Sequence, residues 1–191
     1  MTDACHTSTT EVSPKSNLEH CNGPPAPIEN PFHGLSDGTW LHDRPNEEVY
    51  KLLIDTYRLR MNDRYRLEGS ADSDCIHGGA PNSHVGFRRF LDKVEEKGGL
   101  LPSWWSGEKV AECQRTGVTM GWSSLAVTIG EGEIVAHYRD SNMPMQMRTF
   151  GEQIYGRALG GESADTKMLM LGLEDAGEMI MPLLGFKVVG H

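Results

Sequence analysis

"PNEEVYKLLIDTYRLRMNDRY", residues 45–65, is the longest stretch of the chain with the periodicity of a helix. Pro45 suits the first helical position, where a missing N–H costs no hydrogen bond, and Asp43 is a candidate N-cap just before it. Apolar side chains cover most of the helix circumference, so the remaining polar face is narrow. It consists of Lys51, Asp55, Arg58 and Asn62. A helix with so small a polar face is mostly buried, and we expect it at the centre of the fold.

Arg60 is the anomaly of this helix, because it falls within the apolar arc. We favour a long side chain that reaches past the edge of the core to a carboxylate. The alternative is a charged anchor inside a pocket. Tyr57 and Tyr65 lie near Arg60 in the sequence, so this helix also offers a basic-aromatic surface.

Four further stretches have helical spacing between helix-start and helix-stop residues. They are residues 83–97, capped by Asn82 or Ser83 and ended by Gly98, residues 107–116, capped by Ser106 and ended by Gly117, residues 144–156 and residues 164–176. Residues 122–139 are ambiguous, because the first half alternates as a strand does and the second half has helical spacing. A solitary strand would have no partner, so we favour two short helices there.

These signals predict a mostly α fold, a small irregular helical domain with long loops and a disordered N-terminal tail. Residues 1–29 are polar and proline-rich without periodicity, which is typical of a tail. The helical domain follows as residues 30–157, and residues 158–191 form a Met- and Gly-rich extension that is partly helical. The apolar anchors of the irregular segment that opens the domain are Phe32, Leu35, Trp40 and Leu41.

The chain is acidic, with a formal net charge of -9 over 191 residues. Phosphates would be repelled over most of such a surface, which argues against nucleic acid or an anionic membrane as the main partner. The one basic candidate stretch is residues 56–69. No apolar run approaches the ~18 residues of a membrane span, no secretory leader is visible, and the cysteines are widely spaced. These features favour a reducing setting, cytoplasmic or nuclear.

Motifs that carry catalysis or bind metal are missing from the sequence. It has no Gly-x-Ser-x-Gly elbow, no His-Glu-x-x-His pair, no Walker loop and no Rossmann fingerprint. Cys113 lacks a thiol-protease signature, and we interpret it as a small buried core residue. The soft metal ligands nearest one another are Cys5, His6, His20 and Cys21. Adjacent Cys–His pairs joined by a flexible segment fit a zinc ion poorly, so we assign no metal ligand and expect no cofactor.

Trp104 and Trp105 stand side by side in "LLPSWWSGEK", residues 100–109. Adjacent side chains cannot both point the same way, so we expect one buried ring and one that packs against a neighbouring helix or is exposed. Large rings at helix entries commonly close a core. An exposed tryptophan is instead a candidate anchor for a partner.

Long, idiosyncratic strings between about residues 30 and 157 carry a family resemblance. They include "TWLHDRP" (39–45), "LLPSWW" (100–105) and "MPMQMRTFGEQIYG" (143–156). The region resembles an uncharacterised fungal family whose members are described as MYND-type zinc-finger proteins, and the resemblance implies a protein-interaction role. A MYND finger holds zinc through paired Cys and His ligands, but this chain has four cysteines and no Cys-x-x-Cys pair. Zinc binding and finger-mediated peptide recognition therefore do not carry over.

The residues and the resemblance together predict an intracellular protein-interaction module without catalytic activity of its own. We expect the protein partner to bind an aromatic and Met-rich surface. Its expected residues are Trp40, Tyr57, Arg60, Tyr65, Trp104 and Trp105. The alternative is a small-molecule-binding accessory protein or an enzyme of fungal secondary metabolism, in which the same aromatic residues line a pocket with Arg60, His42 or Asp43 as polar groups. The sequence predicts neither the identity of the partner nor an oligomeric state.

Overall fold

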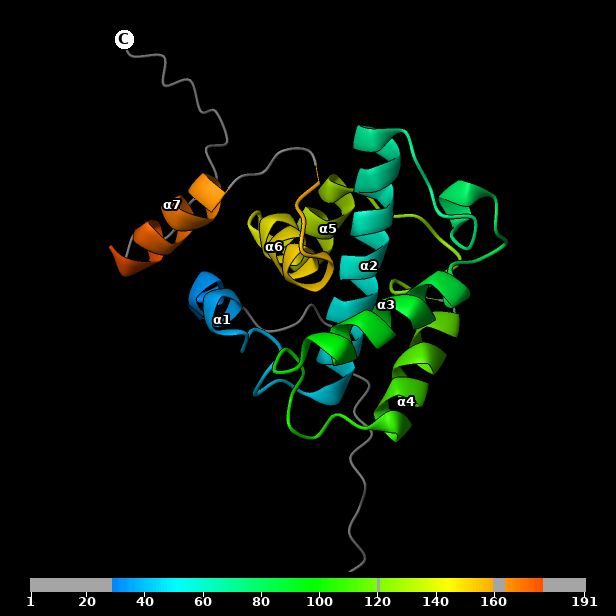
Figure 1. The fold of residues 1–191 in the computed structure, drawn as a ribbon, viewed down its shortest axis with the longest axis horizontal. Coiled ribbons are helices and arrows are strands. Elements are labelled where there is room, and N and C mark those ends of the chain that lie inside the picture. The colour runs from blue at the N-terminus through cyan, green and yellow to red at the C-terminus, as the bar shows by residue number, and fades with distance from the viewer. Residues whose placement is uncertain (1–28, 120, 160–163, 177–191) are drawn as a thin grey trace, which may run out of the picture.

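The computed structural model describes residues 29–119, 121–159 and 164–176. Within these ranges the chain is helical and contains no strand, so the predicted mostly α fold is confirmed (Figure 1). The elements are α1 (Pro31–Asp37), α2 (Asn46–Glu68), a 3-10 turn (Ile76–Gly78), α3 (His84–Lys97), α4 (Gly107–Val118), α5 (Glu131–Tyr138), α6 (Met143–Tyr155) and α7 (Ala164–Asp175). The predicted tail, residues 1–29, lies outside the described residues except for Glu29.

Helix α2 runs through the middle of the molecule, with α3, α4 and α6 packed around it (Figure 1). Its apolar side chains are almost fully buried, which confirms the predicted central position. They include Val49, Leu52, Leu53, Ile54 and Leu59. The expected polar face is wrong as a solvent-facing surface, because Asp55 and Arg58 are also buried.

The start of α2 differs from the prediction. Pro45 occupies the N-cap position, and no side chain caps the helix. Asp43 is therefore not the cap, and its backbone instead has the left-handed φ of 58°. Arg44 supports the entry to α2 by donating to the Trp40 carbonyl at 3.2 Å and to Glu48 at 3.1 Å.

Helices α3, α4 and α6 confirm their predictions within two residues at each end. The Asn82 side chain accepts the His84 N–H at 3.2 Å, so Asn82 is the residue that assists the start of α3. Gly117 does not end α4, which continues to Val118. The side chain of Leu125 packs so closely on Gly117 that a Cβ there would lie 2.5 Å from Leu125 Cδ1. Gly117 is thus a contact point between α4 and the next loop.

Residues 122–130 form an irregular loop, so the prediction of two short helices is wrong for the first of them. The second is α5. The loop lacks helical hydrogen bonds because its backbone bonds to other elements: the Leu125 N–H donates to the Gly117 carbonyl, and the Leu125 carbonyl accepts the Ser83 N–H, each at 2.9 Å. These two bonds attach the loop to α4 and to the start of α3.

Helix α1 forms where an irregular segment was expected, and its predicted apolar anchors are buried in the core. Helix α7, confirmed where residues 164–176 predicted it, packs on α1. Glu174 of α7 accepts the backbone N–H groups of Phe32 and His33 at 2.9 and 3.0 Å. The two His33 ring nitrogens lie 2.7 Å from Glu174 and 3.0 Å from Asp175. No helix among the described residues is long and apolar enough to cross a bilayer.

Candidate functional site

Two of the predicted surface residues are part of the core. Trp40 and Tyr57 are each 2% exposed. The Trp40 indole N–H donates to Gln146 at 3.2 Å. The centre of the Tyr57 ring lies 5.6 Å from that of Phe87 and 5.7 Å from that of Phe90. The prediction that these two residues face a partner is therefore wrong in this structure.

Trp104 and Trp105 are both half-buried, and both contact the same ring. Their centroids lie 6.3 and 6.1 Å from that of Tyr50, edge to face in each case. The indole N–H of Trp105 also donates to Glu95 of α3 at 2.9 Å. The expected split into one buried and one differently placed ring is wrong, because the link between α3 and α4 lays both rings across α2. They close the core at this junction.

Tyr65, near the end of α2, is the predicted site residue with the most exposed side chain, at 50%. Its ring stacks on His77 of the 3-10 turn, with centroids 4.8 Å apart. This contact fixes the 69–83 loop against the last turns of α2.

Arg60 is 7% exposed, and the predicted carboxylate partner is wrong. Its guanidinium lies 4.1 Å from the centre of the Tyr155 ring, and Nη2 donates to the Arg157 carbonyl at 3.2 Å. Among the described residues no carboxylate forms an ion pair with it, and Nε and Nη1 make no hydrogen bond. Burial lowers the pKa of Arg60, but an arginine stays protonated at neutral pH.

Arg60 lines a hollow between α2 and α6. Its lining consists of Thr56, Leu59, Arg60, Asp63, Met147, Arg148, Gly151, Glu152, Ala158 and Leu159. It has room for about one water molecule. Arg148 closes one side by holding Asp63 at 2.8 and 3.2 Å and Glu131 at 2.8 Å. The alternative for Arg60, a charged anchor inside a pocket, is therefore the closer description.

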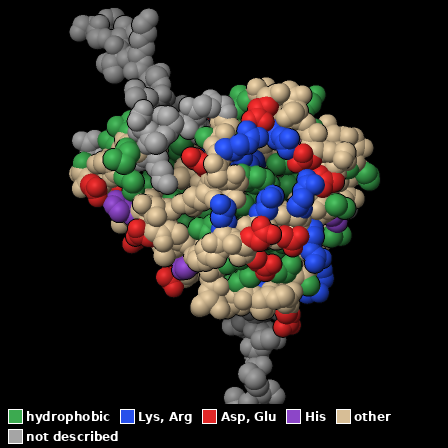
Figure 2. Space-filling model, viewed as in Figure 1, with side chains coloured by type: hydrophobic (Ala, Val, Ile, Leu, Met, Phe, Trp, Pro, Cys, Tyr) green, Lys and Arg blue, Asp and Glu red, His purple; other side chains and the backbone are tan. Residues whose placement is uncertain are grey.

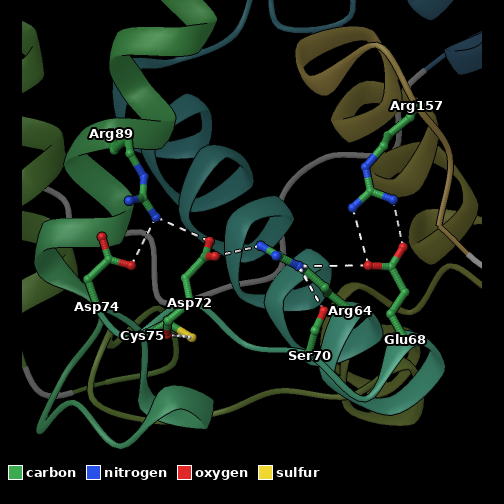
Figure 3. Close-up of polar contacts among 8 residues, drawn as sticks. All are labelled: Arg64, Glu68, Ser70, Asp72, Asp74, Cys75, Arg89 and Arg157. Atoms are coloured by element: carbon green, nitrogen blue, oxygen red, sulfur yellow. Dashed lines mark hydrogen bonds and ion pairs between the residues drawn. The ribbon is translucent and has the colours of Figure 1, made fainter.

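A row of alternating charges begins at Arg157, whose carbonyl accepts from Arg60, and its side chains are drawn in Figure 3. In order it runs Arg157, Glu68, Arg64, Asp72, Arg89 and Asp74. The row joins the segment that follows α6, the end of α2, the 69–83 loop and α3. Sequence reasoning missed it, because its members are brought together by the fold; the signal it did find was the Arg-rich stretch 56–69.

Lysine and arginine side chains gather on this face of an otherwise acidic chain, with carboxylates between them (Figure 2). Lys93 of α3 lies 6.0 Å from the centre of the Tyr155 ring, on which Arg60 also stacks. We call this surface the basic-aromatic face. It comprises Arg60, Arg64, Arg89, Lys93, Tyr155 and Arg157.

A second polar cluster is centred on Asp55, which is fully buried. The buried Asp55 carboxylate accepts hydrogen bonds from Arg58 at 2.8 Å, the Trp122 indole at 2.7 Å and the Tyr138 hydroxyl at 2.8 Å. Arg58 also donates to the carbonyls of Trp122 and Val127. Because every group is bonded inward, this cluster holds the 122–130 loop on α2 and offers nothing to a ligand.

Metal ligands do not assemble in the part of the chain that the structure describes: no three His, Cys, Asp or Glu side chains gather as a metal ion needs. Cys113 is buried, as predicted, and burial raises the pKa of its thiol. Cys5, His6, His20 and Cys21 lie outside the described residues.

No protein-family model matches this chain, and neither a curated protein nor a solved structure does. The resemblance to the MYND-type family stays a prediction.

Proposed function

We propose that this chain is a protein-interaction module that binds an acidic segment of a protein partner through the basic-aromatic face. The observation that carries the proposal is Arg60. A guanidinium has five N–H donors, and the described residues use one of them. A buried cation without a counter-ion costs free energy, and a partner's carboxylate would offset that cost.

The surroundings of Arg60 favour an acidic segment over a single ion. Arg64, Arg89 and Arg157 lie beside it in a partly exposed row, and each retains donors beyond its present ion pairs. The carboxylates of an extended acidic segment could contact several of these arginines in turn. The net charge of the chain is -9, so the rest of the surface repels such a segment and restricts it to this face.

The size of the hollow supports a protein partner over the small-molecule alternative. Pockets that enclose a metabolite usually measure roughly 300–1,000 Å³, whereas this hollow accommodates about one water molecule. A partner that places one carboxylate oxygen in the hollow needs only the space of about one water molecule.

The proposal is tested with a fluorescein-labelled oligoglutamate peptide, by fluorescence anisotropy at low and high salt. We expect saturable binding that salt weakens, and weaker binding by R64Q and R157Q. The matched control is R115Q, which changes the net charge equally on an exposed position of α4. Equal weakening by all three variants, or preference for an oligonucleotide of the same charge, would contradict the proposal.

A further inference from the structure

We infer that the hollow between α2 and α6 is a carboxylate subsite, in which Arg60 receives one carboxylate oxygen from an acidic side chain of the bound segment. The inference deepens the proposed function and rests on it for the origin of the carboxylate. It assigns to one buried residue the anchoring role within a face that otherwise attracts acidic chains by exposed charge.

The guanidinium of Arg60 is already positioned for this task. Its Cζ lies 4.1 Å from the centre of the Tyr155 ring and its Nη2 donates to the Arg157 carbonyl, so two contacts hold the group in place. Nε and Nη1 keep their donors, and Nη1 lies 3.6 Å from the place where a Cβ of residue 151 would be. A guanidinium held before binding loses little conformational entropy when a carboxylate arrives, which favours affinity.

The two carboxylates that line the hollow, Asp63 and Glu152, do not act as the counter-ion of Arg60 among the described residues. Asp63 is held by Arg148, and Glu152 forms no ion pair with Arg60 among the described residues. Thr56, one turn before Arg60, also lines the hollow, and its buried hydroxyl has no hydrogen-bond partner in the described part of the chain. The Thr56 atom that lies near Gly151 is the methyl carbon Cγ2, so the donors that face the hollow are those of Arg60.

Gly151 keeps the hollow open. A Cβ at this position would lie 3.6 Å from Arg60 Cδ and Nη1 and 3.8 Å from Thr56 Cγ2, which are ordinary contact distances. Alanine would therefore fit without displacing Arg60, yet its methyl group would occupy space that holds about one water. The substitution G151A blocks the subsite and leaves every donor in place.

The test compares G151A with G132A, a matched glycine-to-alanine change on α5 with no atom within 4 Å of the new Cβ. Both variants gain helix propensity, so both should fold at least as well as the parent chain. We expect G151A to weaken binding of the oligoglutamate peptide on the order of tenfold, the effect of losing a charge-assisted hydrogen bond, and G132A to bind like the parent chain.

A second measurement follows the Arg60 Nε–H signal by NMR during titration with acetate and, separately, inorganic phosphate. We expect acetate to shift this signal in the parent chain and in G132A but not in G151A. Peptide binding by G151A at parental affinity, or a response to phosphate without one to acetate, overturns the inference. In the first case R64Q and R157Q still report on the proposed function, so the two failures are distinguishable.

Discussion

Replacing Asp55 with asparagine removes the charge at the centre of the buried cluster and keeps the shape of the side chain. The fully buried Arg58 then loses its counter-ion, since the Arg58 and Asp55 side chains are 5% and 0% exposed. In the native protein the two carboxylate oxygens of Asp55 accept hydrogen bonds from Arg58, Trp122 and Tyr138. In asparagine one of these oxygens is replaced by an NH2 group, which cannot accept a hydrogen bond. Breaking a buried ion pair on one side costs about 3–5 kcal/mol. A domain is stable by about 5–15 kcal/mol, so D55N should be folded but close to its limit.

Urea denaturation followed by circular dichroism measures this cost, and a double-mutant cycle tests its origin. R58M should destabilise by a similar amount, because it leaves the Asp55 carboxylate buried without its cation. The double variant D55N/R58M should cost less than the sum by about 0.5–3 kcal/mol. The surface control is D92N, whose partner Arg88 is 64% exposed and whose effect should stay within about 0.5 kcal/mol. Additive effects of D55N and R58M would refute the coupling.

Three other predictions concern the packing and the ends of the fold. G117A should lower stability by about 1–3 kcal/mol in thermal denaturation, because its Cβ overlaps buried Leu125; a stability equal to that of G132A contradicts this. W104A and W105A should both lower the melting temperature, since both rings rest on Tyr50; loss of peptide binding without destabilisation would instead indicate docking. Hydrogen bonding to Glu174 raises the pKa of His33 above 6.5, so the contribution of the His33 charge to the α7 contact is complete below pH 6.5 and is lost as pH rises through the raised pKa. Hydrogen exchange at the Phe32 and His33 amides should show this, and E174Q should weaken the dependence, leaving the part due to Asp175 at 3.0 Å from the His33 ring.

Periodicity predicted the helices because a buried helix requires an apolar arc whatever packs against it. It misjudged Asp55 and Arg58, because a pattern assigns polar residues to solvent unless their partners are known. Those partners, Trp122 and Tyr138, lie in a loop and a helix more than sixty residues away. The same distance in sequence explains the missed loop at 122–130, whose backbone bonds are tertiary.

Of the residues that form the basic-aromatic face, the sequence predicted one, Arg60, as a site residue. Arg60 drew attention because a charge in an apolar arc needs a reason, and this argument uses local sequence alone. Its real neighbour is the ring of Tyr155, which no local pattern connects to it. Trp40 and Tyr57 were assigned to the surface because large aromatic rings serve cores and interfaces alike, and only the fold distinguishes the two uses.

The contact between Gly117 and Leu125 restricts how this sequence can diverge. The carbonyl of Gly117 accepts the Leu125 N–H, so the two backbones cannot separate to admit a larger side chain without losing that bond. A substitution at 117 therefore requires a compensating loss of volume at 125. Homologues with alanine at 117 are expected to carry a smaller residue than leucine at 125. The two positions should therefore covary in an alignment, because they form the contact between α4 and the loop.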